Sequence, residues 1–221
     1  MNLRALKRTS RRQLKTILAA AIFLLAGHSI AGQAAEHTVQ VLDRNGDPVP
    51  NVFVLVDRPA ASEDDTVYVM DQVNLAFDPS VLFIPVGGQV SFPNSDPVAH
   101  HVYSFSKPNN FVLPLYKGQL PSPITFQHEG VVVLGCNIHD HMVGHIVVSN
   151  RAVKGQTDDA GLLTFSDSEL TSQPAKQVQI WSPRIRVREA LVKTLSEDGK
   201  TTFQLTKRLK PPLKRPKFED Y

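Results

Sequence analysis

The residues most able to do chemistry in this 221-residue chain are gathered in one segment. Six of the eight histidines lie in the middle third of the chain, and its single cysteine, Cys136, lies there as well. His139 and Met142 follow Cys136 at intervals of three residues, so a thiolate, an imidazole and a thioether fall within one short loop. Two imidazoles and one thiolate, with a weakly bound thioether, are the ligands of a type 1 copper site. The residue types therefore indicate a copper site, whose second imidazole would come from upstream, from His100 or His101.

The single cysteine excludes several other kinds of site. One thiol cannot form an intramolecular disulfide, a four-cysteine zinc or iron–sulfur site, or a two-copper centre bridged by two thiolates. A multicopper oxidase needs several His-x-His pairs, and His139–His141 is the only one here. A Cys/His hydrolase would need a positioned nucleophile, but no helix-borne nucleophile pattern surrounds Cys136. Zinc stays chemically possible, although a thioether such as Met142 favours copper, and a buried inert thiol stays open. We expect a protein that is not an enzyme.

The elements that must position these residues are predicted to be β-strands throughout. After the first 35 residues, apolar and polar residues alternate with period two, and glycine and proline interrupt the pattern at short intervals. Between residues 62 and 149 this spacing predicts a sandwich of seven or eight antiparallel strands. No stretch beyond residue 35 has a helical period, so the chain is predicted to be all-β.

Shorter β segments are predicted on both sides of that sandwich. Residues 36–61 are expected to form an N-terminal hairpin, because turn residues at 44–48 separate two alternating strands. Residues 150–206 are predicted to form a small β-sandwich-like domain, and the basic, proline-rich residues 207–221 a flexible tail. The flanking segments resemble pieces of a carboxypeptidase-regulatory-like β-sandwich. They would form either one small sandwich interrupted by the central domain or extra strands upon it.

The first 35 residues are predicted to be an export signal that is cleaved near Ala34 or Ala35. They hold six basic residues and no acidic ones, and an apolar run from Ile17 to Ala26 precedes the small residues at their end. Ten apolar residues are too few to cross a bilayer, so no membrane span is expected after the signal is removed. The protein is therefore expected in the periplasm, with the twin-arginine route as a minor option for its export.

The net charge of the whole chain, +3 at pH 7, is determined by this signal and by the tail. Residues 36–206 hold 12 basic and 19 acidic groups, a net charge of −7. An acidic surface repels phosphates, so nucleic acid is excluded as the expected partner.

Residues 90–148, which contain the candidate ligands, resemble the cupredoxins, specifically the plastocyanin and amicyanin group and bacterial methylamine-utilisation proteins. Residues 90–94, followed by His100, are similar to the family's strand before its first histidine ligand. Residues 130–136 keep the family's interval between a glycine and the cysteine ligand. The Cys136-x-x-His139-x-x-Met142 loop, with residues 143–148 after it, is similar to the short ligand loop and closing strand of amicyanin-like members.

Carried over position by position, the resemblance implies a complete set of copper ligands: His100, Cys136, His139 and, in the axial position, Met142. It also implies a Greek-key β-sandwich that holds one type 1 copper per chain and carries single electrons. His139 would be the ligand nearest the surface, with a docking patch around it formed by Pro97, Val98, Ile138, Met142 and Val143. The acidic charge would suit a basic redox partner, such as a cytochrome c or a dehydrogenase.

Departures from the family pattern keep part of the ligand assignment open. Ile138 stands where many relatives have proline, and His101 where many have an asparagine that ties the two ligand loops together. His101 is expected to donate to the backbone near Cys136, to replace His100, or to be an ordinary solvated histidine, and His141 is open in the same way. The remaining histidines of the segment are predicted to take no part: His128 and His145. A periplasmic copper carrier without redox turnover is the alternative function, and a scaffold with a vestigial copper site is a third.

Overall fold

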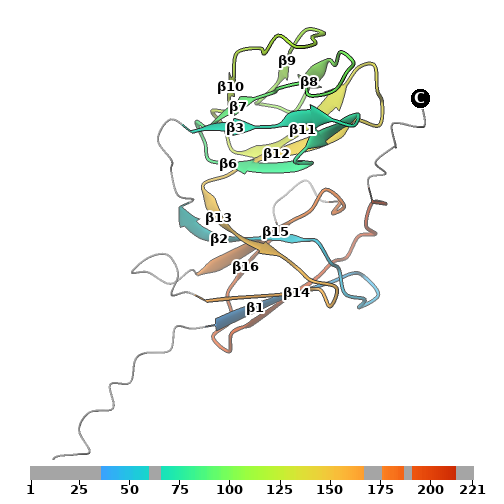
Figure 1. Cartoon of the computed structure of the whole chain (residues 1–221). Coiled ribbons are helices and arrows are strands. Elements are labelled where there is room, and N and C mark those ends of the chain that lie inside the picture. Colours follow the sequence, from blue (N-terminus) through green and yellow to red (C-terminus); the bar gives the residue numbers. More distant parts are fainter. Residues whose placement is uncertain (1–35, 60–65, 167–175, 187–190, 213–221) are drawn as a thin grey trace, which may run out of the picture. The chain divides into compact units, whose positions relative to one another are not determined.

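The computed structural model describes residues 36–59, 66–166, 176–186 and 191–212, and the regular structure within them is β-strand (Figure 1). The predicted all-β class is therefore confirmed. The predicted export signal, residues 1–35, lies outside the described residues, as do residues 213–221 of the predicted tail. In the described ranges no helix is long and apolar enough to span a membrane.

Residues 66–149 form what we call the central sandwich. Its larger sheet has five strands in the order β6-β12-β11-β8-β9, which are Val81–Ile84, Val143–Val148, Gly130–Cys136, Val102–Ser104 and Phe111–Val112. Its smaller sheet has three strands in the order β10-β7-β3, which are Ile124–Thr125, Gln89–Ser91 and Val67–Val69. A separate hairpin is formed by β4, Asp71–Val73, and β5, Ala76–Asp78.

The alternating pattern of β11 shows why these residues form a sandwich. Val132, Leu134 and Cys136 are buried, whereas Val131 and Val133, which alternate with them, are exposed. The buried set belongs to one core cluster that also contains Val90 of the opposite sheet. Alternation therefore places one face of β11 in the core and leaves the other on the surface.

The strand pairing of the central sandwich is mixed, which differs from the predicted antiparallel arrangement. β6 pairs with β12 in parallel, and β3 pairs with β7 in parallel, while the other pairs within its two sheets are antiparallel. Periodicity reports which face of a strand is buried, but it carries no information about strand direction.

The β segments on both sides of the central sandwich form a second body, which we call the flanking sandwich. One of its sheets has the order β14-β1-β17, with strands Leu162–Ser166, Glu36–Leu42 and Lys200–Gln204. The other has the order β13-β2-β15-β16, with strands Arg151–Gln156, Phe53–Pro59, Gln177–Trp181 and Leu191–Thr194. One core cluster joins Val39 of β1, Val54 of β2 and Phe203 of β17, so the arrangement is a single sandwich interrupted by the central one.

The predicted N-terminal hairpin is wrong, because β1 and β2 lie in different sheets. The turn itself is present: the Asp43 side chain accepts hydrogen bonds from the backbone of Asn45 (2.7 Å) and Asp47 (3.1 Å). The strand pairing that this turn closes is limited to one isolated antiparallel bridge between Leu42 and Pro48. The backbone N–H of Val41 donates to the Gly161 carbonyl (2.9 Å) instead of to Val49, so the ladder does not continue and the chain enters the other sheet.

The segment predicted as a tail begins within the described residues. The backbone of Lys210 donates to the Arg184 carbonyl (2.7 Å) and accepts from the Arg184 side chain (3.2 Å). The start of this segment is therefore attached to the flanking sandwich.

Candidate metal centre

Strand pairing at one end of the larger sheet brings the predicted ligands together. Cys136 is the last residue of β11 and pairs with Val102, the first residue of β8. His100 lies two residues before β8, where its backbone forms an antiparallel bridge with Tyr116 (N···O distances 3.1 and 3.0 Å). His139 lies in the loop between β11 and β12, so Cys136 and His139 meet the sequence-distant His100 at this end.

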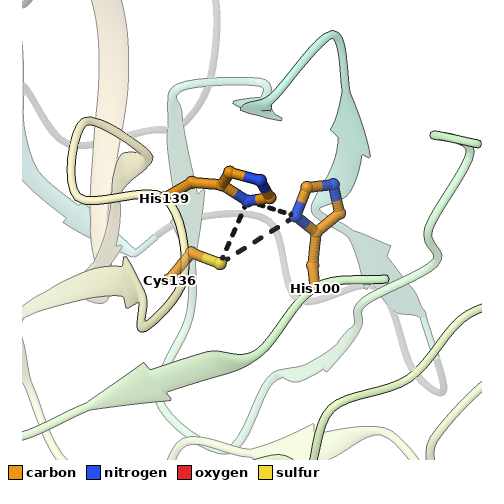
Figure 2. A group of neighbouring side chains, drawn as sticks. All are labelled: His100, Cys136 and His139. Carbon is orange, nitrogen blue, oxygen red and sulfur yellow. Dashed lines mark hydrogen bonds between the residues drawn. The ribbon is translucent and has the colours of Figure 1, made fainter. Parts of the chain in front are cut away.

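Three ligand atoms face one another across a small gap (Figure 2). The Cys136 Sγ atom lies 3.9 Å from Nδ1 of His100 and 3.7 Å from Nδ1 of His139. The two Nδ1 atoms are 3.2 Å apart. For metal bonds of about 2.0 Å to nitrogen and 2.3 Å to sulfur, these separations correspond to angles of roughly 105–130° at the ion. Such angles fit the trigonal plane of a His₂Cys copper site.

The electrostatics of the site favour the thiolate, which is the ligand form of cysteine. Burial raises the pKa of the Cys136 thiol, but hydrogen bonds together outweigh it and lower the pKa to about 6. In order of effect, the hydrogen bonds come from the ring of His100, the backbone of His101 and Ile138, and the ring of His139.

The imidazole of His100 responds to the same surroundings. Burial lowers its pKa, whereas hydrogen bonds with Cys136 and Asp96 raise it, and the net result lies above the ordinary value. A lowered thiol pKa and a raised imidazole pKa are the signature of a thiolate paired with a proton-holding ring in the metal-free protein.

Met142 lies at the end of the ligand loop. Its backbone donates to the His139 carbonyl (2.9 Å), which closes the loop as a tight turn. Its side chain is buried in the same core cluster as Cys136. This places a thioether on the inner side of the loop, and its axial ligation stays a prediction. Because Met142 is buried, it cannot belong to the surface patch predicted for it.

The other histidines of the segment lie outside the three-residue cluster. The His101 ring packs 5.9 Å from the ring of Tyr103, and it is the backbone of His101 that contacts Cys136. Among the described residues the cluster contains His100 and not His101, which favours His100 over His101 as the upstream imidazole ligand. The His141 ring lies 6.1 Å from the His139 ring. His128 is exposed, and His145 is buried in β12.

His139 is the most accessible part of the site. It is half-buried, whereas His100, Cys136 and Met142 are 0–3% exposed. Pro97, Val98 and Ile138 of the predicted docking patch are exposed.

Asp96, which is not among the predicted site residues, is buried and contacts the far side of the His100 ring. Its Oδ2 atom lies 2.8 Å from Nε2 of His100. The available signal was an acidic residue four positions before a candidate ligand, within the loop that begins at Asn94. Asn94 itself is a turn residue, whose side chain accepts from the Asp96 backbone (3.0 Å) and donates to the Val98 carbonyl (2.9 Å).

Comparisons with known proteins give structural neighbours but no sequence family. No family model matches the chain, and no curated protein sequence matches it. The chain is similar to a reduced mutant of amicyanin at 22% identity, covering 45% of this chain and 99% of amicyanin with a TM-score of 0.36. It is similar to a purple cupredoxin from Nitrosopumilus maritimus at 27% identity, covering 37% of this chain and 99% of that one with a TM-score of 0.34. A copper-containing nitrite reductase from Thermus scotoductus is 28% identical over 49% of this chain and 28% of its own, with a TM-score of 0.36. The case for a metal in this chain therefore rests on its own ligand geometry.

Proposed function

We propose that this chain is an exported, mononuclear type 1 copper protein that carries single electrons between redox partners. The observation that carries the proposal is the convergence of His100, Cys136 and His139, whose ligand atoms all lie within 4.8 Å of one another. The cysteine, with its lowered pKa, suits a soft metal, and a thioether within three residues of His139 favours copper over zinc.

In this proposal His100, Cys136 and His139 would hold the ion, with the thioether of Met142 as a fourth, weaker ligand. A copper ion bound there supplies a one-electron couple, and the chain keeps the ligands in place. The backbone of His100 both donates a hydrogen bond to Tyr116 and accepts one from it, and Cys136 is held by its pairing with Val102. Ligands that are held in this way move little when the charge at their centre changes, which keeps electron exchange fast.

His139 is the proposed route for electrons to and from the surface. It is the half-buried ligand, and the exposed side chains of Val98 and Ile138 provide apolar surface near the ligand loops. Residues 62–149 carry eight acidic and two basic groups, which favours a basic partner such as a cytochrome c or a dehydrogenase. Export to the periplasm by the signal at residues 1–35 would place the protein where such partners occur.

The test is an ultraviolet–visible and electron paramagnetic resonance study of the copper-loaded protein. We expect an intense visible band from thiolate-to-copper charge transfer and a Cu(II) resonance with narrow hyperfine splitting. Cys136→Ser should abolish the band, and His128→Gln, which changes an exposed histidine outside the cluster, should leave it unchanged. A colourless wild-type protein after copper loading, or an unchanged spectrum in Cys136→Ser, would overturn the proposal.

A copper carrier without redox turnover is the second candidate, and the half-buried ring of His141, 6.1 Å from that of His139, is the observation that favours it. A carrier must release its metal readily. Electron self-exchange and copper transfer to a chelator separate the two functions, since a carrier should exchange metal quickly and electrons slowly.

A further inference from the structure

The His100 ring makes a separate contact through each of its two nitrogens. Its Nδ1 atom faces Cys136 and His139, so this is the nitrogen available to a metal (Figure 2). Its Nε2 atom faces the Asp96 carboxylate at 2.8 Å. A carboxylate accepts hydrogen bonds, so in the neutral ring the proton lies on Nε2 and the lone pair of Nδ1 is available to a metal.

Asp96 is itself held by a dedicated turn. Its Oδ1 atom accepts a hydrogen bond from the backbone of Asn74 (2.6 Å), and its Oδ2 atom accepts one from the backbone of Leu75 (2.9 Å). Both residues have positive φ angles, 54° and 57°, in the two-residue turn between β4 and β5. This conformation is unfavourable for leucine. The turn therefore adopts a costly backbone conformation that points two N–H groups at one carboxylate.

The contact between Asp96 and His100 is closed to water. The side chain of Asp96 is 3% exposed and that of His100 is 0% exposed. A negative charge next to a ligand ring makes the ring a stronger donor, and in a dry environment it interacts more strongly with an ion of higher charge.

We propose that Asp96 is a positioning residue for the metal centre: it fixes the Nε2–H tautomer of His100 and stabilises the oxidised ion relative to the reduced one. The inference rests on the proposed copper function and adds to it a residue that sets the reduction potential. The turn at Asn74 and Leu75 contributes to this positioning, because its two N–H groups hold the Asp96 carboxylate in place.

The test compares Asp96→Asn with the matched control Asp71→Asn in the copper-loaded protein. Both variants remove one negative charge, but the Asp71 carboxylate accepts from Ser95 and Gln72 instead of a candidate ligand. In Asp96→Asn we expect the thiolate–copper band to persist and the ratio of Cu(II) to Cu(I) affinity to fall about tenfold. This corresponds to a rise in reduction potential of about 59 mV for a one-electron couple. An unchanged potential in Asp96→Asn, or an equal rise in Asp71→Asn, would overturn the inference.

A second measurement covers the case in which Asp96→Asn does not fold. Nitrogen NMR of the wild-type Cu(I) protein should show the His100 proton on Nε2, in slow exchange with water. A proton on Nδ1, or an Nε2 proton in fast exchange, contradicts the inference. If the wild-type protein shows no copper band, the proposed function fails. The tautomer in the metal-free protein at alkaline pH then still decides whether Asp96 orients His100.

Discussion

At the scale of the single residue, the Cys136 thiol gives a signal that can be followed without ambiguity, because it is the only cysteine in the chain. In the metal-free protein we expect the thiolate absorbance to titrate near pH 6, since hydrogen bonds outweigh the effect of burial on its pKa. His100→Phe should raise this midpoint, because the largest of those hydrogen bonds comes from the His100 ring. A wild-type midpoint near 8.5, the ordinary value for cysteine, would contradict the prediction.

The same shift has a consequence for stability. The unfolded thiol keeps its proton to higher pH than the folded one, so the thiolate contributes to stability above about pH 8.5. This contribution is lost as the pH falls through about 6.

His145 should make the protein less stable in acid. Burial, and to a smaller extent the charge of Lys210, lowers the pKa of His145 to about 4. The unfolded histidine binds a proton near pH 6.5 while the folded one does not. The free energy of unfolding should therefore fall between pH 6.5 and 4, by up to about 3 kcal/mol. Above pH 6.5 this contribution to stability is complete.

A phenylalanine at position 145 separates this effect from the titration of other groups. His145 packs against Trp181 at a ring distance of 5.6 Å, a contact that His145→Phe can keep, and its Nδ1 atom has no hydrogen-bond partner among the described residues. Urea unfolding at pH 7 and pH 4.5 should show a smaller loss in His145→Phe than in wild type. The exposed control His128→Gln should lose as much as wild type, and an equal loss in all three proteins would refute the assignment.

At the scale of the element, two glycines in neighbouring strands of the larger sheet are expected to differ in their tolerance of a side chain. A Cβ atom at Gly144 of β12 would lie 2.9 Å from the Cβ of Phe77, which is 1% exposed in β5 and cannot move without its strand. A Cβ atom at Gly135 of β11 would lie 2.8 Å from the tip of the Tyr103 ring, which is partly exposed and can turn away.

Gly144→Ala should therefore destabilise the protein by about 1–3 kcal/mol, and Gly135→Ala by clearly less. Denaturant midpoints of the two variants check this difference. Equal destabilisation would show that the Tyr103 ring is held as firmly as Phe77.

The elements also show what the sequence could and could not predict. Cys136, His139 and Met142 lie within seven residues, so their proximity follows from chain connectivity, and the structure shows that the alternation along β11 places Cys136 in the core. Asp96 could not be found in this way, because its role depends on a turn at Asn74 and Leu75 that is distant in sequence and has an unusual backbone.

The prediction of an N-terminal hairpin also failed because it depended on contacts between residues that are distant in sequence. The turn predicted at residues 44–48 is present, but the partners of β1 are β14 and β17, which are more than 100 residues away. Local pattern determines which face of a strand is buried, and long-range packing decides its neighbour.

At the scale of the whole molecule, the central sandwich is acidic. Residues 66–149 carry five acidic and two basic groups, a net charge of −3, whereas the segments 36–61 and 150–206 together carry −1. The flanking segments are close to neutral, so a basic partner should be attracted to the central sandwich. The rate of electron transfer with a cytochrome c of positive charge should fall as ionic strength rises, because salt screens this attraction.

Stopped-flow kinetics with two charge variants tests where on the protein the cytochrome c binds. Asp140→Asn removes an exposed charge next to His139, and Asp159→Asn removes an exposed charge from the flanking sandwich. We expect Asp140→Asn to slow association at low salt and to reduce the salt dependence, and Asp159→Asn to behave as wild type. The visible copper band of each variant controls for damage to the site. If both variants behave alike, the partner does not approach the surface around His139, and electrons must leave the centre by another route.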